Sequence, residues 1–211
     1  MNKKKQTRTA FFIDGFNLYH SLCTNEKNQY KWLNLRTLCE QFLLNKEIIT
    51  DIFYFSALPT WNLEKQKRHK VYIEALESQD IKVLLGKFKR VSRNCFSKCS
   101  HTNKTFTTFE EKETDVNIAL KLLEFSVTDK FDKAVIISGD SDLIPPVLKI
   151  KQLTPNKKTL CIVPKKGHDL MTTCHSGTRL KKKHLEKSLF PKIIKSNKRV
   201  IECPKEEWLP Q

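Results

Sequence analysis

Residues 9–15 read Thr9-Ala10-Phe11-Phe12-Ile13-Asp14-Gly15, an apolar run that ends at a carboxylate and a glycine. A short run of β-branched and aromatic residues bounded by a turn signal is typical of a buried strand. Four similar runs follow at residues 51–55, 81–85, 134–138 and 159–163. Segments with helical apolar spacing, such as 35–43 and 116–127, separate them. This alternation predicts an α/β sandwich with a mostly parallel central sheet covered by helices on both faces.

Local signals refine this outline. Asn34 and Thr114 are the expected N-caps of helices that begin at the next residue. Residues 87–109 interrupt the alternation, are basic and polar, and end in a strand-like pattern, so we expect an inserted hairpin there. From Gly177 onward the leucine spacing predicts a last helix. We therefore expect a basic amino-terminal tail at 1–8, one domain at 9–195 and a carboxy-terminal tail at 196–211.

The composition favours a packed domain with a polyanionic partner. The chain has 211 residues, of which 39% are hydrophobic, and no apolar run approaches the roughly 20 residues that cross a bilayer. Its net charge of +16 attracts nucleic acid, although a solvated lysine-rich surface is the alternative. The seven scattered cysteines favour reduced thiols, and the basic start is a poor secretory signal. We expect a cytoplasmic protein with no membrane partner.

Carboxylates follow two of the expected strands. Asp14 ends the first, and Asp140 and Asp142 lie in the turn after the fourth, where ligands bind in open parallel sheets. Asp115 begins the helix that leads into that fourth strand. Each acid alone could simply cap a turn or helix. If the first and fourth strands are neighbours, however, all four acids share one crevice.

Four carboxylates in one crevice need a compensating cation. Without one, like charges at this range repel strongly or become protonated. Hard carboxylate oxygens suit Mg²⁺ or Mn²⁺, which also accept phosphate oxygens as ligands. Such an ion activates water and stabilises the charge that develops on a reacting phosphate. The acids therefore indicate phosphodiester hydrolysis.

Three motifs resemble those of the NYN domain family, which is part of the PIN-like nuclease group. They are FIDGFNLY at 12–19, EKETDVNIAL at 111–120 and ISGDSDL at 137–143, with a fainter match, HLEKSLFP, at 184–191. The likeness covers roughly residues 8–195. It implies a PIN-like three-layer α/β/α sandwich and a metal-dependent endoribonuclease whose catalytic and metal-binding acids are Asp14, Asp115, Asp140 and Asp142. Asn17 and Ser138 would support these acids.

The expected hairpin carries a cysteine pair. Cys95, Cys99 and His101 offer two thiolates and an imidazole, which are ligands that Zn²⁺ accepts. The spacing is looser than Cys-x-x-Cys and a fourth ligand is missing, so free thiols are the alternative to a zinc site.

Clustered cations are candidate nucleic-acid contacts, with aromatic residues nearby for base stacking. A solvated basic surface is again the alternative. The candidates are Lys87, Lys89, Arg90, Arg93, Lys112, Arg179, Lys181, Lys182 and Lys183.

The sequence leaves several functions open. RNA is the expected substrate, but no motif reads a 2′-hydroxyl, so a structure-specific DNA nuclease is an alternative. A non-catalytic RNA-binding scaffold of the same fold is another, and a homodimer is compatible with either. An aspartyl phosphatase fits poorly, because Phe16 stands where a second aspartate would be expected.

Overall fold

The computed structural model describes residues 6–23, 28–94, 105–165, 167–195, 199–205 and 208. The strands are β1 (Thr7–Asp14), β2 (Glu47–Ala57), β3 (Lys82–Asn94), β4 (Thr105–Lys112), β5 (Lys133–Ile137), β6 (Lys158–Val163), β7 (Ser176–Arg179), β8 (Ile193–Lys195) and β9 (Val200–Glu202). The α-helices are α1 (Gly15–Ser21), α2 (Leu35–Glu40), α3 (Leu63–Glu77), α4 (Thr114–Val127), α5 (Ile144–Leu153), α6 (His168–Thr173) and α7 (Lys182–Glu186). Two short 3₁₀ turns are η1 (Asn28–Tyr30) and η2 (Ser141–Leu143).

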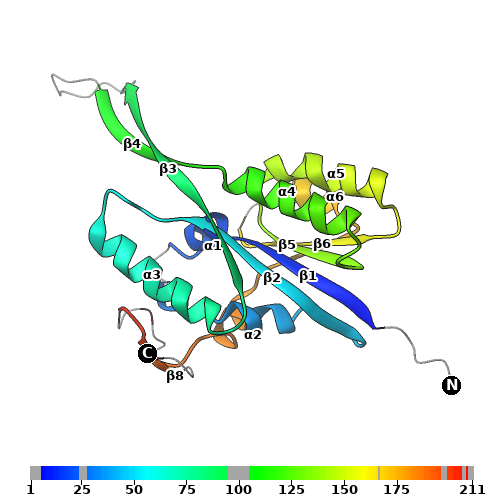
Figure 1. Ribbon diagram of the computed structural model, residues 1–211, viewed down its shortest axis with the longest axis horizontal. Coiled ribbons are helices and arrows are strands. Elements are labelled where there is room, and N and C mark those ends of the chain that lie inside the picture. Colours follow the sequence, from blue (N-terminus) through cyan, green and yellow to red (C-terminus); the bar gives the residue numbers. More distant parts are fainter. Residues whose placement is uncertain are drawn as a thin grey trace.

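A seven-stranded sheet runs through the molecule in the order β4-β3-β2-β1-β5-β6-β7 (Figure 1). Every neighbouring pair is parallel except β3 and β4. The predicted mostly parallel α/β architecture is confirmed. The chain builds outward from β1 through β2 and β3, then returns to place β5 on the other side of β1. This reversal creates a switch point between β1 and β5, where open α/β sheets bind ligands.

Alternate residues of β1 enter two separate hydrophobic cores. Phe11 and Ile13 pack with residues of α1, α2 and α3 on one face of the sheet. Ala10 and Phe12 pack with residues of α4, α5 and α6 on the other face. Because successive strand side chains point to opposite faces, one uninterrupted apolar run serves both layers. Within the described residues, every helix is too short or too polar to cross a lipid bilayer.

The predicted hairpin is present, but its first strand is not separate from the sheet. β3 pairs with β2 over Lys82–Gly86 and with β4 from Lys87 onward. The resulting ribbon projects away from the helical layers (Figure 1). Cys95, Cys99 and His101 fall outside the described residues, so the zinc hypothesis stays a prediction.

Two expectations about the last part of the chain need correction. The segment at Gly177 does not begin a helix: Ser176–Arg179 pairs with β6 as β7, and the helix α7 starts only at Lys182. Part of the predicted carboxy-terminal tail also packs on the domain, since Ile201, Cys203 and Trp208 are buried in the core on the α1–α3 face. Both outcomes depend on contacts with distant parts of the chain. The helical periodicity of the lysine-rich segment does not reveal these contacts.

Local capping explains two helix starts and corrects a third. The Asn34 side chain accepts hydrogen bonds from the backbone of Arg36 and Thr37, as predicted. The predicted cap at Thr114 is wrong, because α4 begins at Thr114 itself and Glu113 precedes it with a left-handed φ of 75°. The Thr114 hydroxyl instead donates to the Glu111 carboxylate. That bond links the end of β4 to the start of α4.

Candidate active site

Asp14 occupies the junction between β1 and α1. Its Oδ1 accepts a hydrogen bond from the Asn17 backbone N–H at 2.9 Å, and its Oδ2 accepts one from the Ser138 hydroxyl at 2.8 Å. A Cβ at Gly15 would lie 2.5 Å from the Tyr54 ring, so only glycine lets α1 begin this close to β2. Asp14 therefore caps α1 and is held rigidly at the carboxyl edge of the sheet.

The turn after β5 supplies the second acid. The Ser138 hydroxyl, which is fully buried, also accepts a hydrogen bond from the Asp140 backbone N–H at 3.0 Å. The Asn17 side-chain oxygen accepts one from the Gly139 backbone N–H at 3.1 Å. Asn17 and Ser138 thus fasten the β5 turn to α1, which positions Asp140 against Asp14. Parallel pairing of β1 with β5 brings the two turns together.

Asp115, in the first turn of α4, completes the group. One carboxylate oxygen from each of Asp14, Asp115 and Asp140 lies within 4.8 Å of the others. Asp142 is not a member of this triad among the described residues. Asp140, rather than Asp142, caps the turn after β5, because its Oδ1 accepts a hydrogen bond from the Asp142 backbone N–H.

The electrostatics of the cluster favour protonation or a bound cation. Burial, together with the charges of Asp115 and Asp140, raises the pKa of Asp14 to about 6, although the hydrogen bonds from Asn17 and Ser138 act to lower it. Burial also raises the pKa of Asp115, with added repulsion from Asp140 and Asp142. Asp142 therefore lies within electrostatic reach of the triad.

Glu111 is a fourth acid of the cluster that the sequence reasoning did not select. Burial, together with the charges of Asp14 and Asp115, raises its pKa to about 7, although the hydrogen bond from Thr114 acts to lower it. It lies at the end of β4, three residues before the start of α4. Its place in the EKETDVNIAL motif was a sequence signal for it, but only the folded structure shows that the charges of Asp14 and Asp115 act on Glu111.

The donor set fits a divalent cation. Three carboxylates converge within the distance that one ion can span, and their ligand atoms are the hard oxygens that Mg²⁺ and Mn²⁺ prefer. Asp14 uses one hydrogen bond on each oxygen, which leaves further lone pairs for a ligand. The predicted acidic metal site is therefore supported at Asp14, Asp115 and Asp140, with the identity of the metal left open.

The predicted nucleic-acid-binding cations do not form one surface of free charges. Lys87 pairs with Glu113, while Arg93 and Lys112 both pair with Glu110. Lys182 pairs with Glu186 within α7. The Arg90 guanidinium donates to Thr107 across the hairpin. Lys89, Arg179, Lys181 and Lys183 are exposed. A role for these residues in binding stays a prediction.

Comparisons with known proteins place the chain in a family. The family model for the NYN domain matches residues 8–179. The curated 6-hydroxy-3-succinoylpyridine 3-monooxygenase HspA of Pseudomonas putida is 26% identical over an alignment of 242 residues, which covers 97% of this chain and 76% of that protein. A solved structure of a protein of unknown function from Vibrio parahaemolyticus matches with a TM-score of 0.59 and 16% identity, covering 90% of this chain and 100% of that one. The structural match supports the fold alone.

Proposed function

The chain belongs to the NYN domain family, and from this membership we propose that it is a metal-dependent nuclease that hydrolyses phosphodiester bonds of RNA. NYN domains belong to the PIN-like nuclease superfamily. The observation that carries the proposal is the convergence of Asp14, Asp115 and Asp140 at the switch point of the sheet, in a protein whose net charge is +16. An acidic cluster in so basic a chain is suited to hold a cation that meets a polyanion.

Each acid has a distinct task in this proposal. Asp14, fixed by Asn17 and Ser138, and Asp140, fixed by its turn, would hold a cation at the carboxyl ends of β1 and β5. Asp115 closes the site from α4. A bound Mg²⁺ or Mn²⁺ would polarise the phosphate and neutralise charge that develops in the transition state. Asp142, outside the triad, would act on it through its charge.

Hydrolysis also requires a proton to move. Water adds to phosphorus and loses one proton, the bond from phosphorus to the leaving oxygen breaks, and that oxygen gains a proton. Glu111 is suited to exchange this proton, because burial raises its pKa to about 7 and the charges of Asp14 and Asp115 act on it. Its Oε1 is already oriented by the Thr114 hydroxyl.

The test is cleavage of labelled RNA and of DNA of the same sequence in Mn²⁺, in Mg²⁺ and in EDTA. We expect metal-dependent cleavage of RNA that Asp140→Asn abolishes. Asp80→Asn is the matched control, because the Asp80 side chain is 95% exposed at the start of β3 and its left-handed backbone suits asparagine. Preferred cleavage of DNA would show that the substrate is DNA and not RNA. Tight RNA binding without cleavage would favour the non-catalytic scaffold.

A small-molecule monooxygenase is a second candidate. It is favoured by the activity of the Pseudomonas putida relative and by an aromatic pocket with cationic side chains near Asp14. One oxygen atom of O₂ would enter an aromatic ring and the other would leave as water, with two electrons from an added reductant. Oxygen uptake that requires a hydroxypyridine carboxylate and a reduced nicotinamide would support this function. An absence of uptake alongside RNA cleavage would reject it.

A further inference from the structure

A pocket is lined by residues that directly follow Asp14 in the chain. Its cavity measures about 330 Å³, which is in the range of sites for small organic ligands. Gly15 and Phe16, which directly follow Asp14, form part of its lining, and Tyr54 on β2 forms another part. Asp14 and Glu111 both act on the pKa of Tyr54, which burial raises. The pocket and the triad are therefore adjacent spaces on either side of the β1–α1 junction.

Several aromatic rings line the pocket. Trp61 stacks on Phe109 with ring centroids 4.0 Å apart and meets the edge of Phe88 at 4.6 Å. Phe16 and Tyr19, on α1, are 41% and 43% exposed although they are large apolar side chains. Exposed ring faces around one cavity are suited to stack on a flat ligand.

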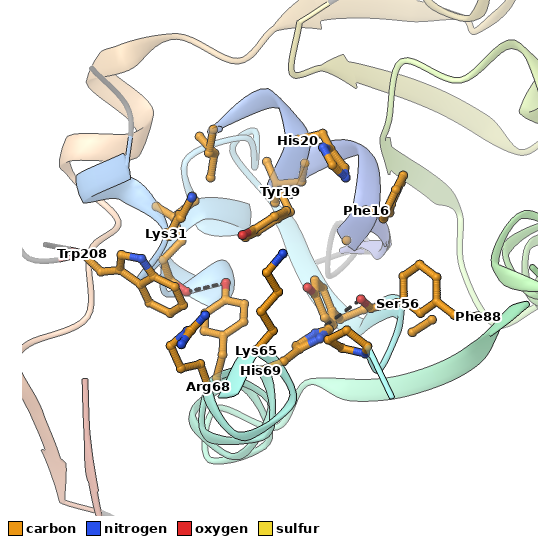
Figure 2. A pocket seen from close by; sticks show the side chains of 18 of the residues that line it. Phe16, Tyr19, His20, Lys31, Ser56, Lys65, Arg68, His69, Phe88 and Trp208 are labelled. Carbon is orange, nitrogen blue, oxygen red and sulfur yellow. Dashed lines mark hydrogen bonds between the residues drawn. The ribbon is translucent and has the colours of Figure 1, made fainter. Parts of the chain in front are cut away.

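Three cations point into the same space. Lys31, Lys65 and Arg68 all line the pocket, and Figure 2 shows Lys65 and Arg68 below Tyr19 and Lys31 to its left. Lys31 lies over the Tyr19 ring, with its ammonium 4.9 Å from the ring centroid. Within the described part of the chain, none of the three forms an ion pair, and no carboxylate lines the cavity. The occupant is therefore expected to bring its own negative charge.

The floor of the pocket carries polar groups that can read the edge of a ring. The Ser56 hydroxyl lies 3.4 Å from His69 Nε2 (Figure 2). Burial lowers the pKa of His69 to about 4, so its imidazole is neutral near pH 7 and offers one donor and one acceptor. The Tyr72 hydroxyl donates a hydrogen bond to the Leu33 carbonyl, so it is already occupied.

We propose that this pocket binds one unpaired nucleotide of the substrate strand, with its base among Phe16, Tyr19 and Trp61 and a phosphate against Lys65 and Arg68. The proposal rests on the nuclease function, and it names the substrate class as single-stranded. The aromatic rings favour a flat base, and the cations favour an anionic phosphate. The neighbouring acids favour a strand that continues from the pocket across the triad. A base within a duplex cannot enter such a pocket without leaving its stack.

The test measures binding in EDTA, so that it does not depend on metal or cleavage. A fluorescein-labelled oligouridylate is titrated with protein and followed by anisotropy, beside the same strand in a duplex. We expect Arg68→Gln and Tyr19→Ala each to weaken single-strand binding roughly tenfold, through loss of a charge-assisted contact and of base stacking. Lys70→Gln removes the same charge from an exposed position of α3 that does not line the pocket, and we expect less than about a twofold effect.

Competition with free ligands identifies the occupant. Uridine monophosphate should displace the labelled strand from the unaltered protein and from Lys70→Gln, and much less well from Arg68→Gln. Equal losses in Arg68→Gln and Lys70→Gln would overturn the proposal, because they would show diffuse charge attraction only. Displacement by benzoate but not by the nucleotide would overturn it in favour of a small aromatic acid.

The results separate this proposal from the nuclease function. Pocket-dependent binding in EDTA without cleavage in Mn²⁺ would support the nucleotide site and reject the nuclease. Cleavage in Mn²⁺, with an affinity for the single strand that is unchanged in Arg68→Gln and Tyr19→Ala, would support the nuclease and reject the nucleotide site. Equal affinity for the duplex and the single strand would also reject it.

Discussion

The carboxylates at the two ends of the central sheet differ in their partners. At the amino ends of the strands, Asp132 accepts three hydrogen bonds from Arg8, and Glu47 pairs with Lys133 at 2.9 Å, with both side chains nearly buried. At the carboxyl ends, Asp14, Asp115 and Asp140 face one another.

The pKa values follow this division. Hydrogen bonds from Arg8 lower the pKa of Asp132 to about 2, whereas burial raises those of Asp14 and Glu111 to about 6 and 7. One sheet therefore uses paired acids at one end to hold strands together and leaves unpaired acids at the other end. Stability resides in the first group, and the second is arranged for a ligand.

The largest expected difference is in the RNA cleavage rate, when an aspartate is changed to asparagine at one end of the sheet or at the other. Asp115→Asn removes a carboxylate from the triad, and we expect RNA cleavage to fall by roughly a thousandfold because transition-state charge loses its stabilising site. Asp132→Asn, at the other end, should leave the cleavage rate within about twofold. Single-turnover rates with saturating Mn²⁺ measure both. Similar losses in the two variants would contradict the division of roles.

The buried pair at the amino end should dominate the free energy of unfolding. Glu47→Gln leaves Lys133 buried without an anion, and we expect a loss of about 2–4 kcal/mol. Asp115→Asn should cost less than about 1 kcal/mol in the metal-free protein, because it also relieves repulsion within the triad. Urea unfolding in EDTA measures both changes. A larger loss in Asp115→Asn would assign a structural role to the triad.

The pH dependence should have opposite sign at the two ends. The folded-state pKa values of Asp14 and Glu111 are raised, so their contribution is present below pH 4 and is lost as the pH rises through 6 to 7. The folded-state pKa of Asp132 is lowered, so its contribution is present above pH 4 and is lost towards pH 2.

Thermal unfolding at several pH values tests these signs. In EDTA we expect the metal-free protein to lose on the order of 1–3 kcal/mol between pH 5 and pH 8 through the raised carboxyls, and Mn²⁺ to restore it. The Asp14→Asn variant should show a weaker pH dependence over this range. A protein whose stability rises from pH 5 to pH 8 in EDTA would show that these acids are not protonated on folding.

A smaller effect is expected at Ser138, which links Asp14 to the turn of Asp140. Ser138→Ala removes the hydroxyl that donates to Asp14 and accepts from Asp140, so we expect roughly a tenfold loss of cleavage and about 1 kcal/mol of stability. Ser138→Thr, which retains the hydroxyl, should recover part of the rate if the added methyl group is accommodated. An unchanged rate in Ser138→Ala would show that the turn is fixed by Asn17 alone.

The sequence predicted the fold and most of the acidic site from local patterns. The apolar runs, the turn glycines and the acids at their ends are short-range features, and parallel strands align such ends without further information. Glu111 was missed because its proximity to Asp14 depends on the pairing of β4 with β3. The prediction that Thr114 is an N-cap was wrong, because its hydroxyl donates a hydrogen bond to the Glu111 carboxylate.

The sequence by itself determined the alternation of strands and helices, the family motifs and the identity of the acids, since each is encoded within a few neighbouring residues. Only the tertiary structure decided which acids converge, which cations are already paired and that an aromatic pocket lies beside the triad. The pocket draws Tyr19, Trp61, Arg68 and Trp208 from segments distant in the chain. Its physical basis is long-range packing, which periodicity and spacing do not record.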